Sequence, residues 1–188
     1  MTKHSLLTVP QAADRLRAGA VIAYPTEAVF GLGCDPGNEE AVQQLLLMKN
    51  RPVTAGLILI ADHYDRFQPF VGTTSPELRQ KAMSTWPGPV TWLFPRAEGV
   101  PDWLAGEHET IALRVTAHSI CRDLCAAFGG AIVSTSANPS SAEPARSVGQ
   151  VYEYFGTCLG GIVAGELGGD ERPSEIRDLA TGAVIRKS

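Results

Sequence analysis

The sequence predicts an α/β fold, in which a twisted, mixed β-sheet carries helices packed outside it. Strand patterns and helix patterns alternate along the 188 residues, which is typical of a layered α/β domain. Between Val90 and Val115, two strands are joined by a connection that is rich in proline and glycine and carries no clear helix. Because parallel strands need a long crossover, usually a helix, we expect the sheet to be mixed.

Helix-start signals mark three helices in the first half of the chain. Thr8 and Gln11 have the spacing of a capping box before a helix that runs to about Arg17. Asn38 caps the run EEAVQQLLLMK, and Ser75, followed by proline, starts the third helix. Strands are expected at 21–24 and 56–61. The second of these, GLILIA, is too apolar to alternate, which favours a strand buried on both faces.

The second half of the chain continues the alternation. Its expected helices are 119–128 and a segment that Ser147 caps, and its expected strands are 90–94, 111–115, 131–134, 161–164 and 183–186. Two long irregular stretches, 136–147 and 165–175, interrupt this pattern. Loops of that length in a compact domain are usually functional, so both are candidates for a binding site.

Composition describes an ordinary globular protein, which we expect to form a single domain over residues 1–188. Hydrophobic residues make up 44% and charged residues 19% of the chain. No apolar run is long enough to span a membrane, and the N-terminus lacks a secretory signal, so we expect a cytoplasmic protein. The four cysteines have no CxxC spacing, which favours free thiols and no metal site.

Charge is distributed unevenly. The net charge of −4 argues against a protein that coats nucleic acid non-specifically. Arginines nevertheless outnumber lysines by twelve to four, and several of them fall in loops or near strand ends. Because the guanidinium fork suits carboxylates and phosphates, we expect a local basic cleft inside an acidic protein.

Polar side chains collect at four points of this pattern. STSAN at 134–138 follows an apolar strand, where it serves either turn formation or ligand binding. YPTEAVFGLGCDP at 24–36 and LMKNRP at 47–52 also follow regular elements. Lys49 would by default complement the dipole of its helix, whereas Arg51 lies past the helix end. Arg114 interrupts an apolar strand and should face a cleft or a carboxylate. The usual nucleotide-binding motifs, GxxxxGK[ST] and GxGxxG after a strand, are absent.

In this order, the stretches resemble the YrdC family of threonylcarbamoyl-AMP synthases, in its short, single-domain form. The resemblance runs from about Val21 to Arg186 and includes K-x-R at 49–51 and S-x-N at 136–138. It implies a twisted α/β sheet with a large basic cleft. It also implies a reaction in which L-threonine, bicarbonate and ATP give threonylcarbamoyl-AMP and pyrophosphate. Other enzymes then transfer the threonylcarbamoyl group to tRNA, next to the anticodon.

The resemblance also implies roles for individual residues. Lys49 and Arg51 would be catalytic and hold the phosphates. The remaining ATP-binding residues would be Thr110, Ser136, Asn138, Arg146 and Arg186, and the threonine-binding residues would be Thr26, Arg114, Ser134 and Ser174. Mg²⁺ would be held mainly by ATP and pyrophosphate, and no organic cofactor is expected. Three positions depart from the family pattern. Many relatives carry threonine at Ala28 and glycine at Ser141, and longer relatives carry, at Ile60, a histidine near the substrate.

Two alternatives remain. One is a non-catalytic module that binds RNA in the basic cleft, although the net charge and the absence of an RNA-binding motif count against it. The other is the related carbamoyl-transfer domain of hydrogenase maturation proteins, which works inside a much longer chain.

Overall fold

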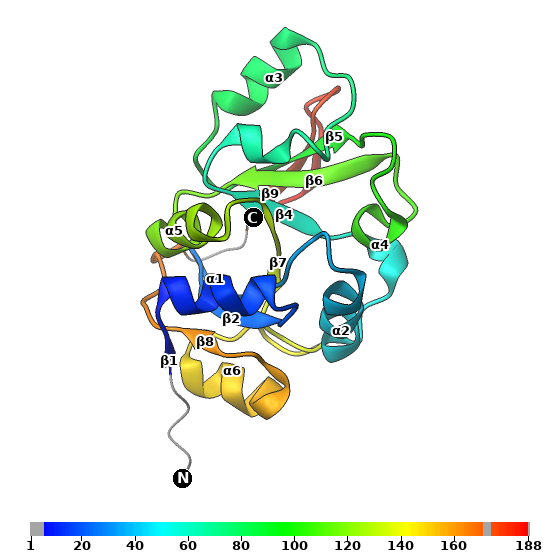
Figure 1. The fold of residues 1–188 in the computed structure, drawn as a ribbon. Coiled ribbons are helices and arrows are strands. Elements are labelled where there is room, and N and C mark those ends of the chain that lie inside the picture. The colour runs from blue at the N-terminus through cyan, green and yellow to red at the C-terminus, as the bar shows by residue number, and fades with distance from the viewer. Residues whose placement is uncertain (1–5, 171–173, 188) are drawn as a thin grey trace.

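A computed structural model describes residues 6–170 and 174–187. Within them, ten strands form one sheet (Figure 1). The strands are β1 (Leu6–Leu7), β2 (Ile22–Pro25), β3 (Phe30–Gly33), β4 (Ile58–Ala61), β5 (Val90–Pro95), β6 (Thr110–Val115), β7 (Ile132–Ser136), β8 (Ile162–Val163), β9 (Glu175–Asp178) and β10 (Val184–Arg186). The helices are α1 (Val9–Arg17), α2 (Glu39–Lys49), α3 (Pro76–Met83), α4 (Asp102–Ala105), α5 (Ser119–Phe128) and α6 (Val148–Phe155), with short 3₁₀ turns η1 (Val53–Ala55), η2 (Tyr64–Phe67) and η3 (Gly156–Cys158).

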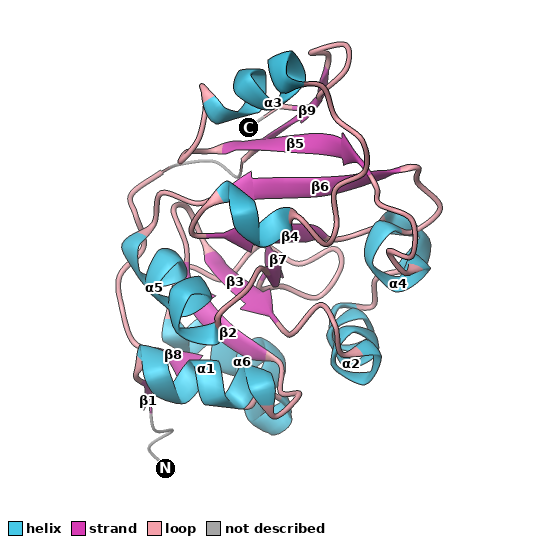
Figure 2. Cartoon of the chain, turned by 45° about the horizontal axis from the view of Figure 1, so that its top comes forward, coloured by secondary structure: helices cyan, strands magenta, loops and turns pink. Residues whose placement is uncertain are grey.

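The sheet is mixed, as the sequence predicts. Its order is β1-β8-β2-β3-β7-β4-β6-β5-β9-β10. Strands β4 and β6 pair in parallel, whereas β5 and β6, which flank the connection rich in proline and glycine, are antiparallel. Strand β7 lies antiparallel between β3 and β4. As a result, the end of β2, the start of β3, the end of β7 and the start of β4 lie next to one another near the middle of the sheet (Figure 2).

Helices cover both faces of the sheet (Figures 1 and 2). On one face α1 packs against α5, and their apolar side chains form a core with β2 and β4. The core on the other face includes α2, α4 and the rings of Trp86, Trp92 and Phe94. Leu59 belongs to the second core and Ile60 to the first. Strand β4 is therefore buried on both faces, and the prediction made from GLILIA is confirmed.

The helix caps also agree with the sequence. Thr8 and Gln11 form the capping box of α1, with the Thr8 amide donating to Gln11 Oε1 over 2.9 Å. Asn38 Oδ1 accepts the Ala41 amide at the start of α2, and Ser147 Oγ accepts the Gln150 amide at the start of α6. No helix in the described part of the chain is both long and apolar enough to cross a membrane.

Several elements differ from the sequence-based expectation. Strands β1, β3 and β9 and the short helix α4 were not predicted, and the strand expected at 131–134 continues to Ser136. Strand β3 was not predicted because two of its four residues, in the sequence FGLG, are glycines, which are uncommon in strands. A Cβ on Gly33 would collide with the Val133 carbonyl and lie 2.8 Å from the Tyr24 ring. The glycines of β3 therefore make room for neighbouring groups, and the usual strand pattern is lost.

Candidate functional site

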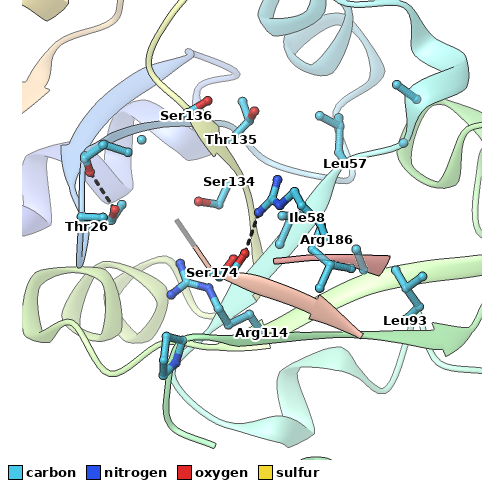
Figure 3. A pocket seen from close by; sticks show the side chains of 18 of the residues that line it. Thr26, Leu57, Ile58, Leu93, Arg114, Ser134, Thr135, Ser136, Ser174 and Arg186 are labelled. Atoms are coloured by element: carbon cyan, nitrogen blue, oxygen red, sulfur yellow. Dashed lines mark hydrogen bonds between the residues drawn. The ribbon is translucent and has the colours of Figure 1, made fainter. Parts of the chain in front are cut away.

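A cavity of about 360 Å³ opens where the ends of the central strands meet (Figure 3). Three arginines and two carboxylates line it: Arg51, Arg114, Arg186, Glu27 and Asp170. Hydroxyl groups line another part, from Thr26, Thr110, Ser134, Thr135, Ser136 and Ser174. The rest of the wall is apolar and includes Leu57, Leu93, Leu104, Ile176 and Ile185. The cavity thus offers cationic groups, hydroxyl groups and an apolar surface to one ligand.

Eight of the eleven residues that the resemblance implies line this cavity: Thr26, Arg51, Thr110, Arg114, Ser134, Ser136, Ser174 and Arg186. They come from segments far apart in the sequence. Thr26 follows β2, Arg51 follows α2, Arg114 lies in β6 and Arg186 ends β10. The other three residues, Lys49, Asn138 and Arg146, are not part of the cavity wall.

Arg114 faces both a cleft and a carboxylate, as its place in an apolar strand predicts. Its Nη1 lies 2.7 Å from Glu27 Oε1, and only 9% of its side chain is exposed. The same Glu27 oxygen accepts the Thr116 hydroxyl at 2.7 Å and the Ala117 amide at 3.2 Å. Burial alone would raise the pKa of Glu27, but the Arg114 charge and the hydrogen bonds from Arg114 and Thr116 lower it to about 2. Glu27 is therefore an anion that fixes the direction of the Arg114 guanidinium.

Hydroxyl groups on the wall are held in defined directions. Thr26 Oγ1 donates to the Val29 carbonyl over 2.7 Å, so its lone pairs remain for a ligand that donates. Ser174 Oγ shares a 3.0 Å hydrogen bond with the hydroxyl of Thr91, a fully buried residue of β5. Ser136 Oγ donates to Asn138 Oδ1 over 2.6 Å. Each of these hydroxyls is thus oriented before any ligand binds.

Two further arginines, one after α2 and one at the end of β10, also line the cavity. Arg51 Nη2 donates to the carbonyls of Ala55 and Gly56, at 3.2 and 2.9 Å. Arg186 Nη2 donates to the Ser174 carbonyl at 2.8 Å (Figure 3). Burial lowers the pKa of Arg186, and the charges of Arg51 and Arg114 lower it further. Since these cations repel one another, an anionic ligand would be stabilised between them.

Lys49, Asn138 and Arg146 lie beside the cavity wall. The Lys49 ammonium is turned toward the carbonyls of Ser136 and Asn138, and the Asn138 amide group donates to the Ala142 carbonyl over 2.7 Å. Arg146 Nη1 is 3.4 Å from the Ala28 carbonyl. That these three residues bind ATP stays a prediction. In the same loop Ser141 has a φ of 73°, a left-handed conformation that favours glycine.

Sequence reasoning missed four residues that shape the site. Glu27 and Asp170 supply its carboxylates, His108 lines it, and Thr91 orients Ser174 from behind. Glu27 could have been found, because it lies in the polar stretch YPTEAVFGLGCDP and Arg114 was expected to face a carboxylate. The sequence gives no sign of the role of Thr91, because threonine is common in β-strands.

Cysteines and metal ligands give no second site in the described residues. Cys34, Cys121 and Cys125 are buried free thiols and Cys158 is an exposed one, which confirms the prediction of free thiols. Burial raises the pKa of the Cys121 thiol well above its ordinary value, so this group is not a reactive thiolate. Within residues 6–170 and 174–187, no three His, Cys, Asp or Glu side chains are grouped so that they could hold a metal ion.

Comparisons with known proteins agree with the geometry. The Sua5/YciO/YrdC family model, described as telomere recombination, matches residues 14–188. A threonylcarbamoyl-AMP synthase of Halorhodospira halophila is 51% identical over 179 residues, which are 95% of this chain and 94% of that protein. A threonylcarbamoyl-AMP synthase of Pseudomonas savastanoi is 55% identical over 179 residues, 95% of this chain and 96% of that protein.

A solved structure extends the similarity to three dimensions. The crystal structure of P. abyssi Sua5 complexed with L-threonine superposes with a TM-score of 0.88 at 30% identity. The match covers 95% of this chain and 53% of the Sua5 chain, so this chain spans about half the length of that protein. With a family model over nearly all of its residues and relatives at half identity, this chain belongs to the Sua5/YciO/YrdC family.

Proposed function

We propose that the chain is a threonylcarbamoyl-AMP synthase, which converts L-threonine, bicarbonate and ATP into threonylcarbamoyl-AMP and pyrophosphate. The observation that carries the proposal is a single cavity in which Arg114, Arg51 and Arg186 converge from three distant segments. One guanidinium suits a carboxylate and the other two suit phosphates. Relatives at 51% and 55% identity carry the name of this enzyme.

Arg114 is proposed to hold the carboxylate of threonine. Glu27 occupies its Nη1 and fixes the guanidinium plane, so the substrate carboxylate would meet an oriented partner. A carboxylate held in this way does not attack ATP. The amine of threonine takes up carbon dioxide from bicarbonate, and an oxygen of the resulting carbamate attacks the α-phosphorus. The bond between the α- and β-phosphates breaks, and pyrophosphate leaves.

Thr26, Ser134 and Ser174 are proposed to surround the rest of threonine. Because the Thr26 hydroxyl donates its hydrogen to the Val29 carbonyl, it can only accept from the substrate. A threonine hydroxyl or amine could provide that hydrogen. Ser174, held by Thr91, offers a second oriented hydroxyl from the opposite wall. This arrangement would read the polar groups of threonine by hydrogen bonds.

ATP is proposed to lie along the side of the cavity that carries Arg51, Arg186, Thr110 and Ser136. Stabilising the charge that develops on the phosphates is the main task for such groups, with no covalent step on the protein. Mg²⁺ would arrive with ATP and neutralise phosphate charge, with its ligands coming mainly from phosphate oxygens and water. The apolar wall around Leu57, Leu93 and Leu104 offers a surface for the base.

The product is proposed to pass to enzymes that transfer the threonylcarbamoyl group to tRNA. RNA binding as the main function is not favoured, because the relatives are named as synthases. The net charge of −4 also counts against an RNA-binding module.

The proposal is tested by pyrophosphate release in the presence and absence of L-threonine, with Arg51→Ala compared to wild type. Loss of a charge-assisted phosphate contact in a cavity is worth about 2–4 kcal/mol of transition-state free energy, or roughly 30-fold to 1000-fold in rate. Arg122→Ala, an exposed position on α5, is the matched control and should keep full activity. Near-normal turnover by a folded Arg51→Ala protein would remove Arg51 from the phosphate site.

A further inference from the structure

The ammonium group of Lys49 is buried and already saturated with acceptors. Lys49 is the last residue of α2, and 4% of it is exposed. Its Nζ lies 2.5 Å from the Ser136 carbonyl, 2.8 Å from the Asn138 carbonyl and 3.3 Å from Asn138 Oδ1. An ammonium has three donors. Each of them therefore has an acceptor within the protein, and none is left for a ligand.

The backbone at the end of α2 separates Lys49 from Arg51. Asn50, between them, adopts a left-handed conformation with φ 50° and ψ 48°. The Lys49 side chain is buried and is not part of the cavity wall. The Arg51 side chain lines the cavity. The two basic residues of the K-x-R motif thus face different environments.

Lys49 is connected to the cavity through the loop that it holds. Its backbone carbonyl accepts the Ser140 amide at 2.7 Å, so Lys49 holds the 136–140 loop with both its backbone and its side chain. Asn138 Oδ1, which accepts from Lys49, also accepts the Ser136 hydroxyl at 2.6 Å. Ser136 lines the cavity. A continuous chain of contacts therefore runs from the Lys49 ammonium through Asn138 to a hydroxyl in the site.

We propose that Lys49 is a positioning residue, whose buried ammonium holds the Ser136–Ser140 loop in place on the cavity wall and does not bind the phosphates. The proposal rests on the proposed function, since it assigns a role at the same site. The two basic residues of the K-x-R motif would then have different roles. Lys49 is a buried cation that positions the loop, and Arg51 is a cation in the cavity that contacts the substrate. Removing the Lys49 charge would leave the Asn138 carbonyl without its donor. The Ser136 carbonyl would keep only the Asn138 amide, and Asn138 Oδ1 would keep only the Ser136 hydroxyl.

Lysine acylation distinguishes the two roles in the wild-type protein. The chain has only four lysines, and Lys187 is an exposed internal control. Burial, together with the charge of Arg51, lowers the pKa of Lys49 to about 8. If it were accessible, Lys49 would therefore react readily at neutral pH. We expect acetic anhydride, followed by peptide mass spectrometry, to label Lys49 at least about tenfold more slowly than Lys187, with no change when inorganic pyrophosphate is added. Rapid labelling that pyrophosphate prevents would overturn the proposal.

A matched pair of variants measures the consequence. Lys49→Met keeps the length of the side chain and removes its donors, and Arg51→Met does the same in the cavity. Lys49→Met should lower kcat by about tenfold or more, as expected for lost charged hydrogen bonds, and leave the KM for ATP within about threefold. It should also speed hydrogen exchange at the Ser140 amide. Its affinity for inorganic pyrophosphate, measured by calorimetry, should stay within about threefold of wild type, whereas Arg51→Met should weaken it by about tenfold or more.

The readouts separate the possible failures. Equal loss of pyrophosphate affinity in Lys49→Met and Arg51→Met, with unchanged exchange at Ser140, would overturn the positioning role. If Lys49→Met does not fold, acylation of the wild-type protein decides by itself. Absence of turnover in the wild type would contradict the proposed function alone, because acylation and pyrophosphate binding need no turnover.

Discussion

Glu27 and Arg114 form the ion pair on which the proposed threonine site depends. Glu27→Gln keeps the size of the side chain and removes the charge that directs Arg114. The lowering of the Glu27 pKa from 4.5 to about 2 corresponds to about 3 kcal/mol of folding free energy at neutral pH. We expect a loss of that order in denaturant unfolding, together with weaker L-threonine binding by calorimetry. Glu143→Gln, an exposed glutamate in the 136–147 loop, should change neither.

The same pair predicts how stability depends on pH. Because the Glu27 pKa is lower in the folded state than in the unfolded state, its stabilisation is complete above about pH 4.5 and is lost as the pH falls toward 2. The difference in unfolding free energy between wild type and Glu27→Gln should therefore shrink over that interval. A difference that stays constant between about pH 6 and pH 2.5 would mean that Glu27 is not the group that titrates.

At the scale of elements, the segment that follows β8 is held against the turn between β2 and β3. The Gly168 amide donates to the Thr26 carbonyl at 3.0 Å, and the Asp170 amide donates to the Glu27 carbonyl at 2.9 Å. His118 Nε2, at the start of α5, lies 3.1 Å from the Glu166 carbonyl and links the same segment to α5. The position of Glu27 therefore depends on close contact with this segment.

Gly168→Ala tests that contact. A Cβ on Gly168 would lie 2.9 Å from Glu27 Cα and 3.2 Å from its carbonyl oxygen, so the backbone of Glu27 would have to move. We expect a cost of about 1–3 kcal/mol in stability and a weaker affinity for L-threonine. Gly149→Ala in α6, where a Cβ meets only Ser147 Oγ at 3.8 Å, should leave threonine binding unchanged. Equal affinities in both variants would show that the segment does not support the site.

Elements with a clear local signal could be predicted from the sequence. The caps at Thr8, Asn38 and Ser147 and the apolar run of β4 use side chains that are typical of their positions. The missed strands lack such signals. Strand β3 has glycines where the Tyr24 ring passes, and β9, with the sequence EIRD, is a polar strand that pairs with β5 and β10. Both strands are stabilised by contacts with residues far away in the sequence, which local patterns do not reveal.

At the scale of the whole molecule, the sheet brings Thr26, Arg51, Arg114 and Arg186 to one cavity. The resemblance named these residues, but it did not indicate which side chains face the cavity. Lys49 and Arg51 are two residues apart, and the resemblance gives both the same role at the phosphates. The left-handed turn at Asn50 and the carbonyls of the 136–140 loop give the two side chains different surroundings. Burial of a charged group depends on tertiary contacts, so it could not be predicted from the motif.

The assembled cavity also predicts which amino acid is used. Valine has the shape of threonine without the hydroxyl, and it would leave a polar group of the site unpaired. This asymmetry can be worth several orders of magnitude in kcat/KM, whereas the missing methyl of serine is worth roughly 1–3 kcal/mol. Pyrophosphate release should therefore be fastest with threonine, detectable with serine and nearly absent with valine. If valine supported pyrophosphate release as fast as serine, the Thr26 hydroxyl would not be hydrogen-bonded to the hydroxyl of the substrate.

In the proposed reaction, an oxygen of the threonine carbamate attacks the α-phosphorus of ATP while Arg114 holds the carboxylate. Mass spectrometry of the adenylate formed from ATP, L-threonine and ¹³C-labelled bicarbonate tests it most directly. We expect one adenylate that carries the heavy carbon, and a fall in pyrophosphate release when dissolved carbon dioxide is removed. An unlabelled threonyl adenylate, formed at the same rate without bicarbonate, would show that the carboxylate attacks ATP and that the proposed reaction is wrong.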